Sequence, residues 1–352
     1  MRRPLALALF LILALALALA LAGCGAKPEP GAGAGSGSRE DLRLVLDYFP
    51  NADHAGIYAA EASGEYGRAG LDVDIKAPPD PAAPLKLLRA GRADLVLSYE
   101  PELLLARDKG ANDLVAVGAL VQRPLTALMA LPGSGIRTAK DLAGKRVGTA
   151  GIAYQSAYLK TIAEKAGIDP GSIKETNVGF DFTRPLIAGR VDATLGAFWN
   201  YEGADLQRRG KKPVILKMDE LGVPAYDELV FVARKEDLDE DGASRIRRFL
   251  QATARGHRAL EKDPATGVDA LLKASKGLDR GLQEAVVKAT LPVFFPKDSE
   301  QPWGWQDPAQ WDAYGRWMQD NGLLKRPLAA ARALTNEFLP GEGLDPGVSG
   351  LN

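Results

Sequence analysis

The sequence has little of the side-chain chemistry on which most enzymes depend. Its 352 residues include one cysteine, Cys24, and two histidines, His54 and His257. A tetrahedral zinc site or a Cys/His nucleophile needs several such residues together, so neither a metal site nor covalent catalysis is expected. The Gly133-Ser-Gly135 stretch lacks the third glycine of a dinucleotide fingerprint, and Gly144-Lys-Arg lacks the Ser/Thr of a phosphate-binding loop. These absences favour a binding protein with no cofactor over an enzyme.

Disulfides and blocks of like charge are also missing. A single cysteine cannot form an intramolecular disulfide, so stability must come from the hydrophobic core. The 44 basic and 45 acidic residues are interspersed and give a net charge of -1, so nucleic acid is not an expected partner. The stretch from residue 39 to residue 352 exceeds the roughly 250–300 residues that one core can serve. We therefore expect two lobes.

The N-terminus, by contrast, is rich in apolar residues. Arg2 and Arg3 precede an apolar run from Leu5 to Leu21, which ends in Leu21-Ala-Gly-Cys24. This order is typical of a secretory signal, and a cysteine after two small residues resembles the lipobox of bacterial lipoproteins. The run is shorter than the roughly 20 residues of a membrane-spanning helix. We expect a signal peptide over 1–23, a lipid on Cys24 and anchoring to the outer face of the cytoplasmic membrane.

Residues 24–39 are mostly Gly, Ala, Ser and Pro, which predicts a flexible tether. Short β-rich runs then alternate with helical patterns, which indicates an α/β fold with mostly parallel strands. Gly91-Arg-Ala-Asp and Gly189-Arg-Val-Asp repeat one helix-to-strand turn, in keeping with two similar lobes. Beyond residue 233 the pattern is almost wholly helical. We expect lobe one over 40–124 and 230–342, lobe two over 125–229, and two strand crossings near Leu125 and Leu229.

Four loops that follow expected strands are candidates for a ligand site, because ligands of α/β folds bind beyond the carboxyl ends of strands. Aromatic residues make up 7% of the chain but gather in these loops, which predicts a flat ring as ligand. Few basic residues occur there, which disfavours a sulfonate, nitrate or phosphate, although an anion on the backbone at Gly151 stays open. Phe49 and Phe198 could equally be core residues. The candidate ligand contacts are Asp47, Tyr48, Asn51, His54, Tyr99, Glu100, Tyr154, Trp199, Asn200, Tyr201 and Glu202.

Several motifs resemble one family over roughly residues 40–340. They are Leu46-Asp-Tyr-Phe-Pro-Asn-Ala-Asp-His54, Gly56-Ile-Tyr-Ala59, Trp199-Asn-Tyr-Glu202, Tyr226-Asp-Glu-Leu229 and Thr335-Asn-Glu-Phe-Leu339. They resemble the receptors for pyrimidine precursors of thiamin that serve bacterial ABC transporters, in a family shared with fungal pyrimidine synthases. The resemblance implies a two-lobed periplasmic binding protein of type 2, with an inserted second lobe and a hinge of two crossing strands. It also implies a monomer that captures a formylaminopyrimidine or hydroxymethylpyrimidine and delivers it to an ABC permease.

The resemblance assigns roles to individual residues. Tyr48 and Trp199 would stack on the ring, Glu202 would accept from its amino groups, and Asn51 would be a polar contact. Alignment with the synthase branch places Ser98 at its lysine and Glu102 at its histidine, and this chain lacks the four-cysteine segment of that branch, so no enzyme activity is implied. Receptors for riboflavin or a flavin precursor remain an alternative, and an aliphatic sulfonate or nitrate receptor or a pyrimidine synthase is a weaker one.

Overall fold

The computed structural model of the chain describes residues 39–295 and 300–340. The expected signal peptide, Cys24 and nearly all of the expected tether lie outside these ranges. Within them, no helix is both long enough and apolar enough to cross a membrane.

Lobe one is built on a five-stranded sheet. Its order is β2 (Leu71–Lys76), β1 (Glu40–Val45), β3 (Leu95–Ser98), β10 (Leu229–Arg234) and β4 (Leu114–Val121). β1 pairs in parallel with β2 and β3, whereas β10 is antiparallel to both of its neighbours. Every residue of β3, inside the sheet, and of β4, at its edge, is buried, as expected for strands covered on both faces.

Lobe two repeats this arrangement. Its sheet has the order β7 (Lys174–Asn177), β6 (Arg146–Thr149), β8 (Ala193–Phe198), β5 (Thr126–Ala130) and β9 (Val214–Lys217). β6 pairs in parallel with β7 and β8, and β5 is antiparallel to β8 and β9. The predicted α/β fold with two lobes is therefore confirmed.

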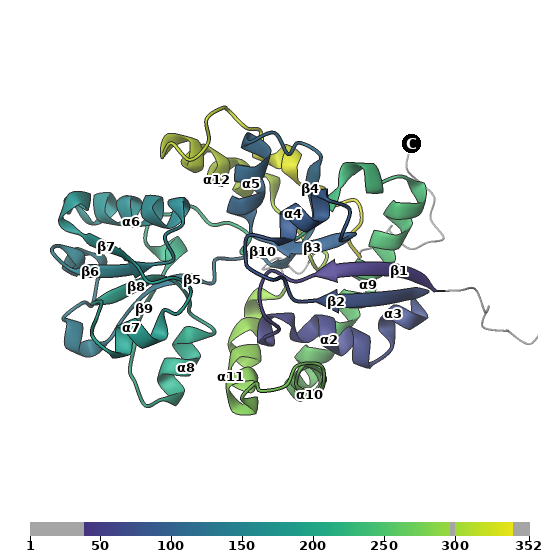
Figure 1. Cartoon of the computed structure of the whole chain (residues 1–352), viewed down its shortest axis with the longest axis horizontal. Coiled ribbons are helices and arrows are strands. Elements are labelled where there is room, and N and C mark those ends of the chain that lie inside the picture. The colour runs from purple at the N-terminus through teal and green to yellow at the C-terminus, as the bar shows by residue number, and fades with distance from the viewer. Residues whose placement is uncertain (1–38, 296–299, 341–352) are drawn as a thin grey trace, which may run out of the picture. The chain divides into compact units, whose positions relative to one another are not determined.

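The expectation of mostly parallel strands is wrong, because half of the strand pairings are antiparallel. The reason lies in the two crossings, residues 122–125 between β4 and β5 and residues 218–228 between β9 and β10. In lobe one, β10 follows the second crossing and lies beside β4, which precedes the first. In lobe two, β5 follows the first crossing and lies beside β9, which precedes the second. Both β10 and β5 are antiparallel to their neighbours. Figure 1 shows the two sheets and the segments that join them.

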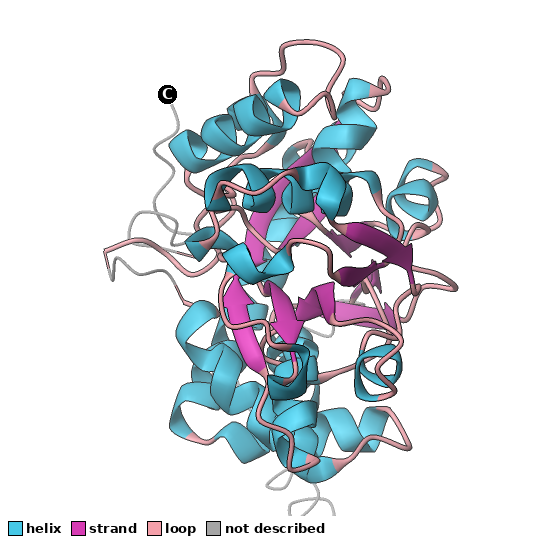
Figure 2. Ribbon diagram, turned by 90° about the vertical axis from the view of Figure 1, so that its left-hand side faces the viewer, coloured by secondary structure: helices cyan, strands magenta, loops and turns pink. Residues whose placement is uncertain are grey.

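Helices lie on either side of the strands (Figure 2). They are α2 (Ala55–Ala62), α3 (Glu65–Arg68), α4 (Pro84–Arg89), α5 (Glu100–Asp108), α6 (Ala153–Ala166), α7 (Thr183–Ile187), α8 (Glu202–Arg208), α9 (Glu240–Lys262), α10 (Pro264–Ala274), α11 (Arg280–Thr290) and α12 (Pro308–Asp320). α2 and α3 are separate helices, because Gly64 between them adopts a left-handed φ of 75°.

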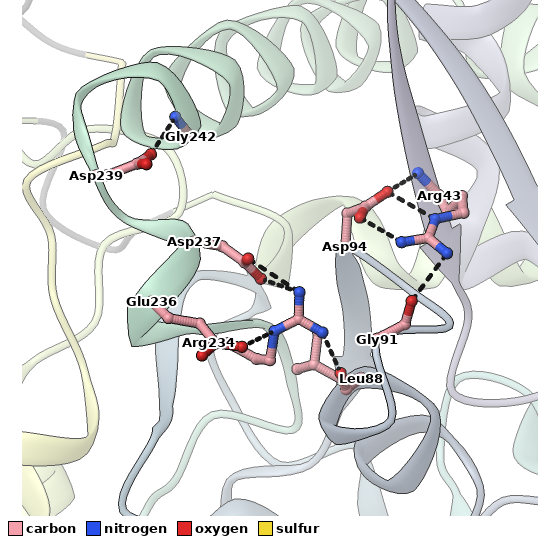
Figure 3. Close-up of polar contacts among 9 residues, drawn as sticks. All are labelled: Arg43, Leu88, Gly91, Asp94, Arg234, Glu236, Asp237, Asp239 and Gly242. Atoms are coloured by element: carbon pink, nitrogen blue, oxygen red, sulfur yellow. Dashed lines mark hydrogen bonds and ion pairs between the residues drawn. The ribbon is translucent and has the colours of Figure 1, made fainter.

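The repeated Gly-Arg-x-Asp turn makes the same contacts in each lobe. In lobe one, the guanidinium of Arg43 on β1 donates to both carboxylate oxygens of Asp94, at 2.7 and 3.0 Å, and to the carbonyl of Gly91 (Figure 3). The backbone N–H of Arg43 also donates to Asp94, at 2.8 Å. Nearby, Arg234 at the end of β10 pairs with Asp237. The turn thus fixes where β3 begins beside β1.

In lobe two, Arg146 on β6 takes the place of the arginine on β1. Its backbone N–H and guanidinium donate to Asp192 at 2.8 and 2.7 Å, and the guanidinium donates to the carbonyl of Gly189 at 2.9 Å. The sequence echo therefore reflects one structural element used twice.

Close packing of α2 on α9 explains the glycine of the Gly56-Ile-Tyr-Ala motif. A Cβ at Gly56 would lie 2.3 Å from the ring of His257, and one at Gly256 would lie 2.2 Å from the carbonyl oxygen of Gly56. His257 is fully buried between these helices, and its ring centroid lies 4.8 Å from that of Trp303 with the two rings tilted by 35°. Burial lowers the pKa of His257 to about 4, so the ring is neutral and acts as a core residue.

We predict that Gly56→Ala lowers the free energy of unfolding by about 1–3 kcal/mol, because the added methyl group overpacks this contact. Chemical denaturation of the ligand-free protein measures the change. Gly133→Ala is the matched control, since a Cβ at that exposed turn meets no atom within 4 Å. Equal stabilities of the two variants would contradict the packing argument.

Candidate ligand-binding site

A cavity of about 580 Å³ lies where the loops of both lobes meet the two crossings. Lobe one contributes the loop after β1 and the segment from the end of β3 into α5. Lobe two contributes the start of α6, the loop before α7 and the corner between β8 and α8. The carboxyl ends of β1, β3, β6 and β8 lead into these segments, as expected for an α/β site. Eight of the predicted contacts line the cavity, namely Asp47, Tyr48, Asn51, His54, Tyr99, Tyr154, Tyr201 and Glu202.

Asp47 is held in place by two neighbours on the lobe-one wall. Its Oδ1 lies 2.8 Å from Nε2 of His54, and its Oδ2 accepts from the hydroxyl of Tyr99 at 2.7 Å. The backbone N–H of Asn51 donates to Nδ1 of His54 at 3.2 Å, so Nδ1 is an acceptor and Nε2 carries the proton that Asp47 accepts. His54 is fully buried and therefore positions Asp47.

Asn51 shapes the loop that presents the aromatic side chains of lobe one. Its Oδ1 accepts from the N–H of Asp53 at 2.8 Å, and its Nδ2 donates to the carbonyl of Phe49 at 3.0 Å. These bonds hold Tyr48 and Phe49 at the cavity, with ring centroids 5.1 Å apart. Phe49 is 62% exposed, so it is a rim residue and not part of the core.

On the lobe-two wall, Glu202 begins α8 and accepts from the N–H of Phe198 at 2.7 Å. At the neighbouring loop, the N–H of Ala150 donates to Gln155 and the N–H of Gly151 donates to Thr149. These two backbone donors therefore already have acceptors within lobe two.

Trp199 does not line the cavity, which corrects its expected place as a stacking wall. Its indole N–H donates to the carbonyl of Pro124 at 2.9 Å, and its backbone N–H donates to the carbonyl of Leu125 at 2.9 Å. The amine of Lys217 lies 4.2 Å from its ring centroid, a favourable cation–π arrangement. Trp199 thus ties β8 to the first crossing.

Glu100 and Asn200 also lie outside the lining, and both are fully buried. Glu100 accepts from the backbone N–H of Asp227, a residue of the second crossing, at 2.7 Å. Asn200 donates to Asp53 at 2.6 Å and to Thr290 at 2.7 Å. Since Asn200 belongs to lobe two and its two acceptors to lobe one, it joins the lobes and does not contact the cavity.

The sequence reasoning missed several residues of the lining. Glu228 lies in the Tyr226-Asp-Glu-Leu229 motif and was given no role, and Phe180 and Phe182 lie in a loop that no strand pattern singled out. Phe180 is 46% exposed and lies 6.3 Å from the ring of Tyr48. An apolar ring at a polar surface loop is the signal that could have identified it.

Burial raises the pKa of three acids at this site. Burial raises the pKa of Glu202 to about 7 and that of Glu228 to about 7, although backbone N–H donors lower both. Burial likewise raises the pKa of Asp53 to about 6. Such clustering of perturbed acids in a cleft is typical of functional sites.

The lining has one dominant chemistry. Of its residues, eight are Phe or Tyr and six are Asp or Glu, and no lysine or arginine of residues 39–295 and 300–340 is among them. These walls suit a flat ring that donates hydrogen bonds or carries positive charge, and they oppose an anion. In the same ranges, no group of three or more His, Cys, Asp and Glu side chains could hold a metal ion.

Comparisons with known proteins agree on one family. Residues 51–266 match the family model described as NMT1/THI5 like. The chain is 31% identical to the formylaminopyrimidine-binding protein of Halalkalibacterium halodurans, over 84% of this chain and 90% of that protein. It is 27% identical to the 4-amino-5-hydroxymethyl-2-methylpyrimidine phosphate synthase of Legionella pneumophila, over 84% and 92% of the two chains. The relatives thus include both binding proteins and synthases.

Solved structures show the same fold at low sequence identity. The periplasmic aliphatic sulphonate binding protein SsuA from Escherichia coli superposes with a TM-score of 0.67 at 18% identity, over 84% of this chain and 97% of that one. The alkanesulfonate-binding protein SsuA from Xanthomonas axonopodis pv. citri gives 0.65 at 21% identity, over 86% and 100%. These likenesses establish the two-lobed fold of periplasmic binding proteins.

We predict that Glu202→Gln stabilises the ligand-free protein at pH 8 and has little effect below pH 4.5. Folding raises the pKa of Glu202 from 4.5 to about 7, so the folded state binds the extra proton and wild-type stability falls as pH rises between these values. A neutral amide removes that loss, which amounts to about 1–3 kcal/mol.

Denaturant unfolding of both proteins from pH 4 to pH 8 measures this difference. Glu261→Gln, at an exposed site on α9, is the control for the loss of one surface charge. A difference between Glu202→Gln and wild type that does not change with pH would contradict the burial of an ionisable Glu202.

Proposed function

The chain belongs to the NMT1/THI5-like family, and we propose that it is an extracytoplasmic receptor for a pyrimidine precursor of thiamin. The ligand would be of the formylaminopyrimidine or hydroxymethylpyrimidine type, and an ABC importer would receive it. A solute-binding role is supported by the fold of periplasmic binding proteins together with a relative that binds formylaminopyrimidine.

The observation that carries the choice of ligand is the lining of aromatic and acidic side chains without a basic one. An aminopyrimidine has a flat face and several N–H donors, and each has a counterpart in this cavity. Tyr48 offers a ring face and Glu202 a carboxylate, and the ring of Phe180 lies 6.3 Å from that of Tyr48. A sulfonate would face carboxylates with no cation to pair with.

Binding without chemistry is supported by the residues at the positions that the synthase comparison singled out. Ser98 is buried at the end of β3, and Glu102 lines the cavity. Both ring nitrogens of His54 are engaged by neighbours. A lysine-bound pyridoxal group would give the protein an absorbance band that a protein without a cofactor lacks, so a spectrum of the purified protein separates a synthase from a receptor.

We further propose export through the signal peptide over 1–23 and lipid attachment at Cys24. The tether over 24–39 would let a monomeric receptor reach its permease while it remains anchored. Fold neighbours that are periplasmic support export, and the anchor rests on the sequence pattern.

Calorimetric titration tests the ligand class. We expect formylaminopyrimidine and hydroxymethylpyrimidine to bind more tightly than riboflavin, and an alkanesulfonate not to bind, because the lining has carboxylates and lacks a cation. Tyr48→Ala should weaken pyrimidine binding by about 10-fold through loss of stacking. Failure of all three aromatic compounds, or tightest binding of the sulfonate, would refute the proposal.

Membrane fractionation of cells that express the full chain tests the anchor. We expect the wild-type protein in the membrane fraction and Cys24→Ala in a soluble or unprocessed form, because the lipid acceptor is lost. A Gly133→Ala variant, altered at an exposed turn and not in the expected leader, serves as the control. Equal distribution of Cys24→Ala and wild type would rule out anchoring through Cys24.

A further inference from the structure

Among the described acids of the cavity, Glu228 is distinguished by a carboxylate that connects the two crossings. It belongs to the second crossing, just before β10, and it is 3% exposed. Its Oε2 accepts from the backbone N–H of Leu125 at 2.7 Å and from that of Thr126 at 2.9 Å. Leu125 ends the first crossing and Thr126 begins β5, and they lie 103 and 102 positions away in the sequence, respectively.

The two carboxylate oxygens of Glu228 are used unequally. Oε2 accepts three hydrogen bonds, since the hydroxyl of Tyr226 also donates to it, at 3.2 Å. Among the described residues, Oε1 has one weak partner, the hydroxyl of Thr126 at 3.3 Å. A carboxylate oxygen has two lone pairs, so Oε2 is saturated and Oε1 retains capacity for a further donor.

Glu228 also faces the cavity. It lines the cavity together with Thr126 and Leu229, the residues beside it at the crossings. Glu202, the acid expected to accept from the amino groups of the ligand, accepts from the backbone N–H of Phe198, which belongs to the same lobe. A donor that reaches Glu202 touches one lobe, whereas a donor that reaches Glu228 touches the connection between both lobes.

We propose that Glu228 couples ligand binding to the geometry of the hinge, with Oε2 holding the two crossings together and Oε1 accepting an N–H of the ligand. This inference rests on the proposed function. The position of Oε1 is set by the bonds that Oε2 makes to Leu125 and Thr126. A donor-bearing ligand therefore binds best to the hinge arrangement in which those bonds are intact, and this difference in affinity is what shifts the population toward that arrangement.

Two substitutions separate the two roles of Glu228. In Glu228→Gln the amide oxygen still accepts from Leu125 and Thr126, but an NH₂ group replaces Oε1 and opposes a ligand donor. In Glu228→Ala both roles are lost. Glu100→Gln is the matched control, because Glu100 is a fully buried acid that accepts a backbone N–H at the same crossing and does not line the cavity.

Two measurements are made on each protein, calorimetry with formylaminopyrimidine and amide hydrogen exchange at Leu125 and Thr126. We expect ligand to slow exchange at both amides in the wild type. Glu228→Gln should keep the ligand-free exchange rates and bind about 10–100-fold more weakly, the loss typical of one hydrogen bond to a charged group. Glu228→Ala should exchange faster at both amides, and Glu100→Gln should bind within about threefold of wild type, since it removes no contact of the cavity.

The outcomes distinguish this inference from the proposed function. Wild-type protein that binds no pyrimidine rejects the proposed function and the inference with it. Wild-type binding with unchanged affinity in Glu228→Gln, or with equal losses in Glu100→Gln, overturns the inference and leaves the function standing. Should a variant fail to fold, exchange in the wild type still decides, because ligand that leaves the Leu125 and Thr126 amides unaffected also overturns it.

Discussion

The chain passes between its lobes twice, and the two crossings must stay together for the sheets and the cavity to form. Residues 122–125 and 218–228 feed strands that lie side by side in each sheet. The carboxylate of Glu228, in the second crossing, accepts hydrogen bonds from two backbone N–H groups at the end of the first crossing and the start of β5. Because the loops of both lobes converge there, the cavity forms at the point where the lobes are joined.

Placing acids at such a point has an energetic cost. Burial raises the pKa of Glu202, Glu228 and Asp53, which means that the folded protein holds these carboxylates ionised only at some expense of stability. Backbone and amide donors offset part of this cost, as Asn200 does for Asp53 at 2.6 Å. Sites that sacrifice stability in this way are commonly sites of function. A ligand that brings its own N–H donors would recover part of the loss, which is why we propose a ligand rich in such donors.

Much of the architecture could be predicted from the sequence because it rests on local patterns. The repeated Gly-Arg-x-Asp motif indicated equivalent turns, and these turns make matching contacts in the two lobes. The loops after the strands supplied most of the cavity. The antiparallel direction of β5 and β10 could not be predicted from the sequence. It follows from the return of the chain from one lobe to the other, which leaves no local pattern.

The site was harder to predict, for two physical reasons. A motif places residues on a loop but does not determine where each side chain points, so Trp199 and Asn200 were expected in the cavity and instead contact Pro124 and Asp53. Contacts between distant segments leave no local pattern either. The bonds from Leu125 and Thr126 to Glu228 span more than a hundred positions, and composition alone does not reveal them.

A crystal structure of the complex with formylaminopyrimidine shows whether one ligand reaches both carboxylates. We expect the pyrimidine ring inside the cavity, with one face against Tyr48 and its N–H groups within hydrogen-bonding distance of Glu202 and of Oε1 of Glu228. A ring bound elsewhere on the protein, or one whose N–H groups point away from both carboxylates, would contradict this expectation.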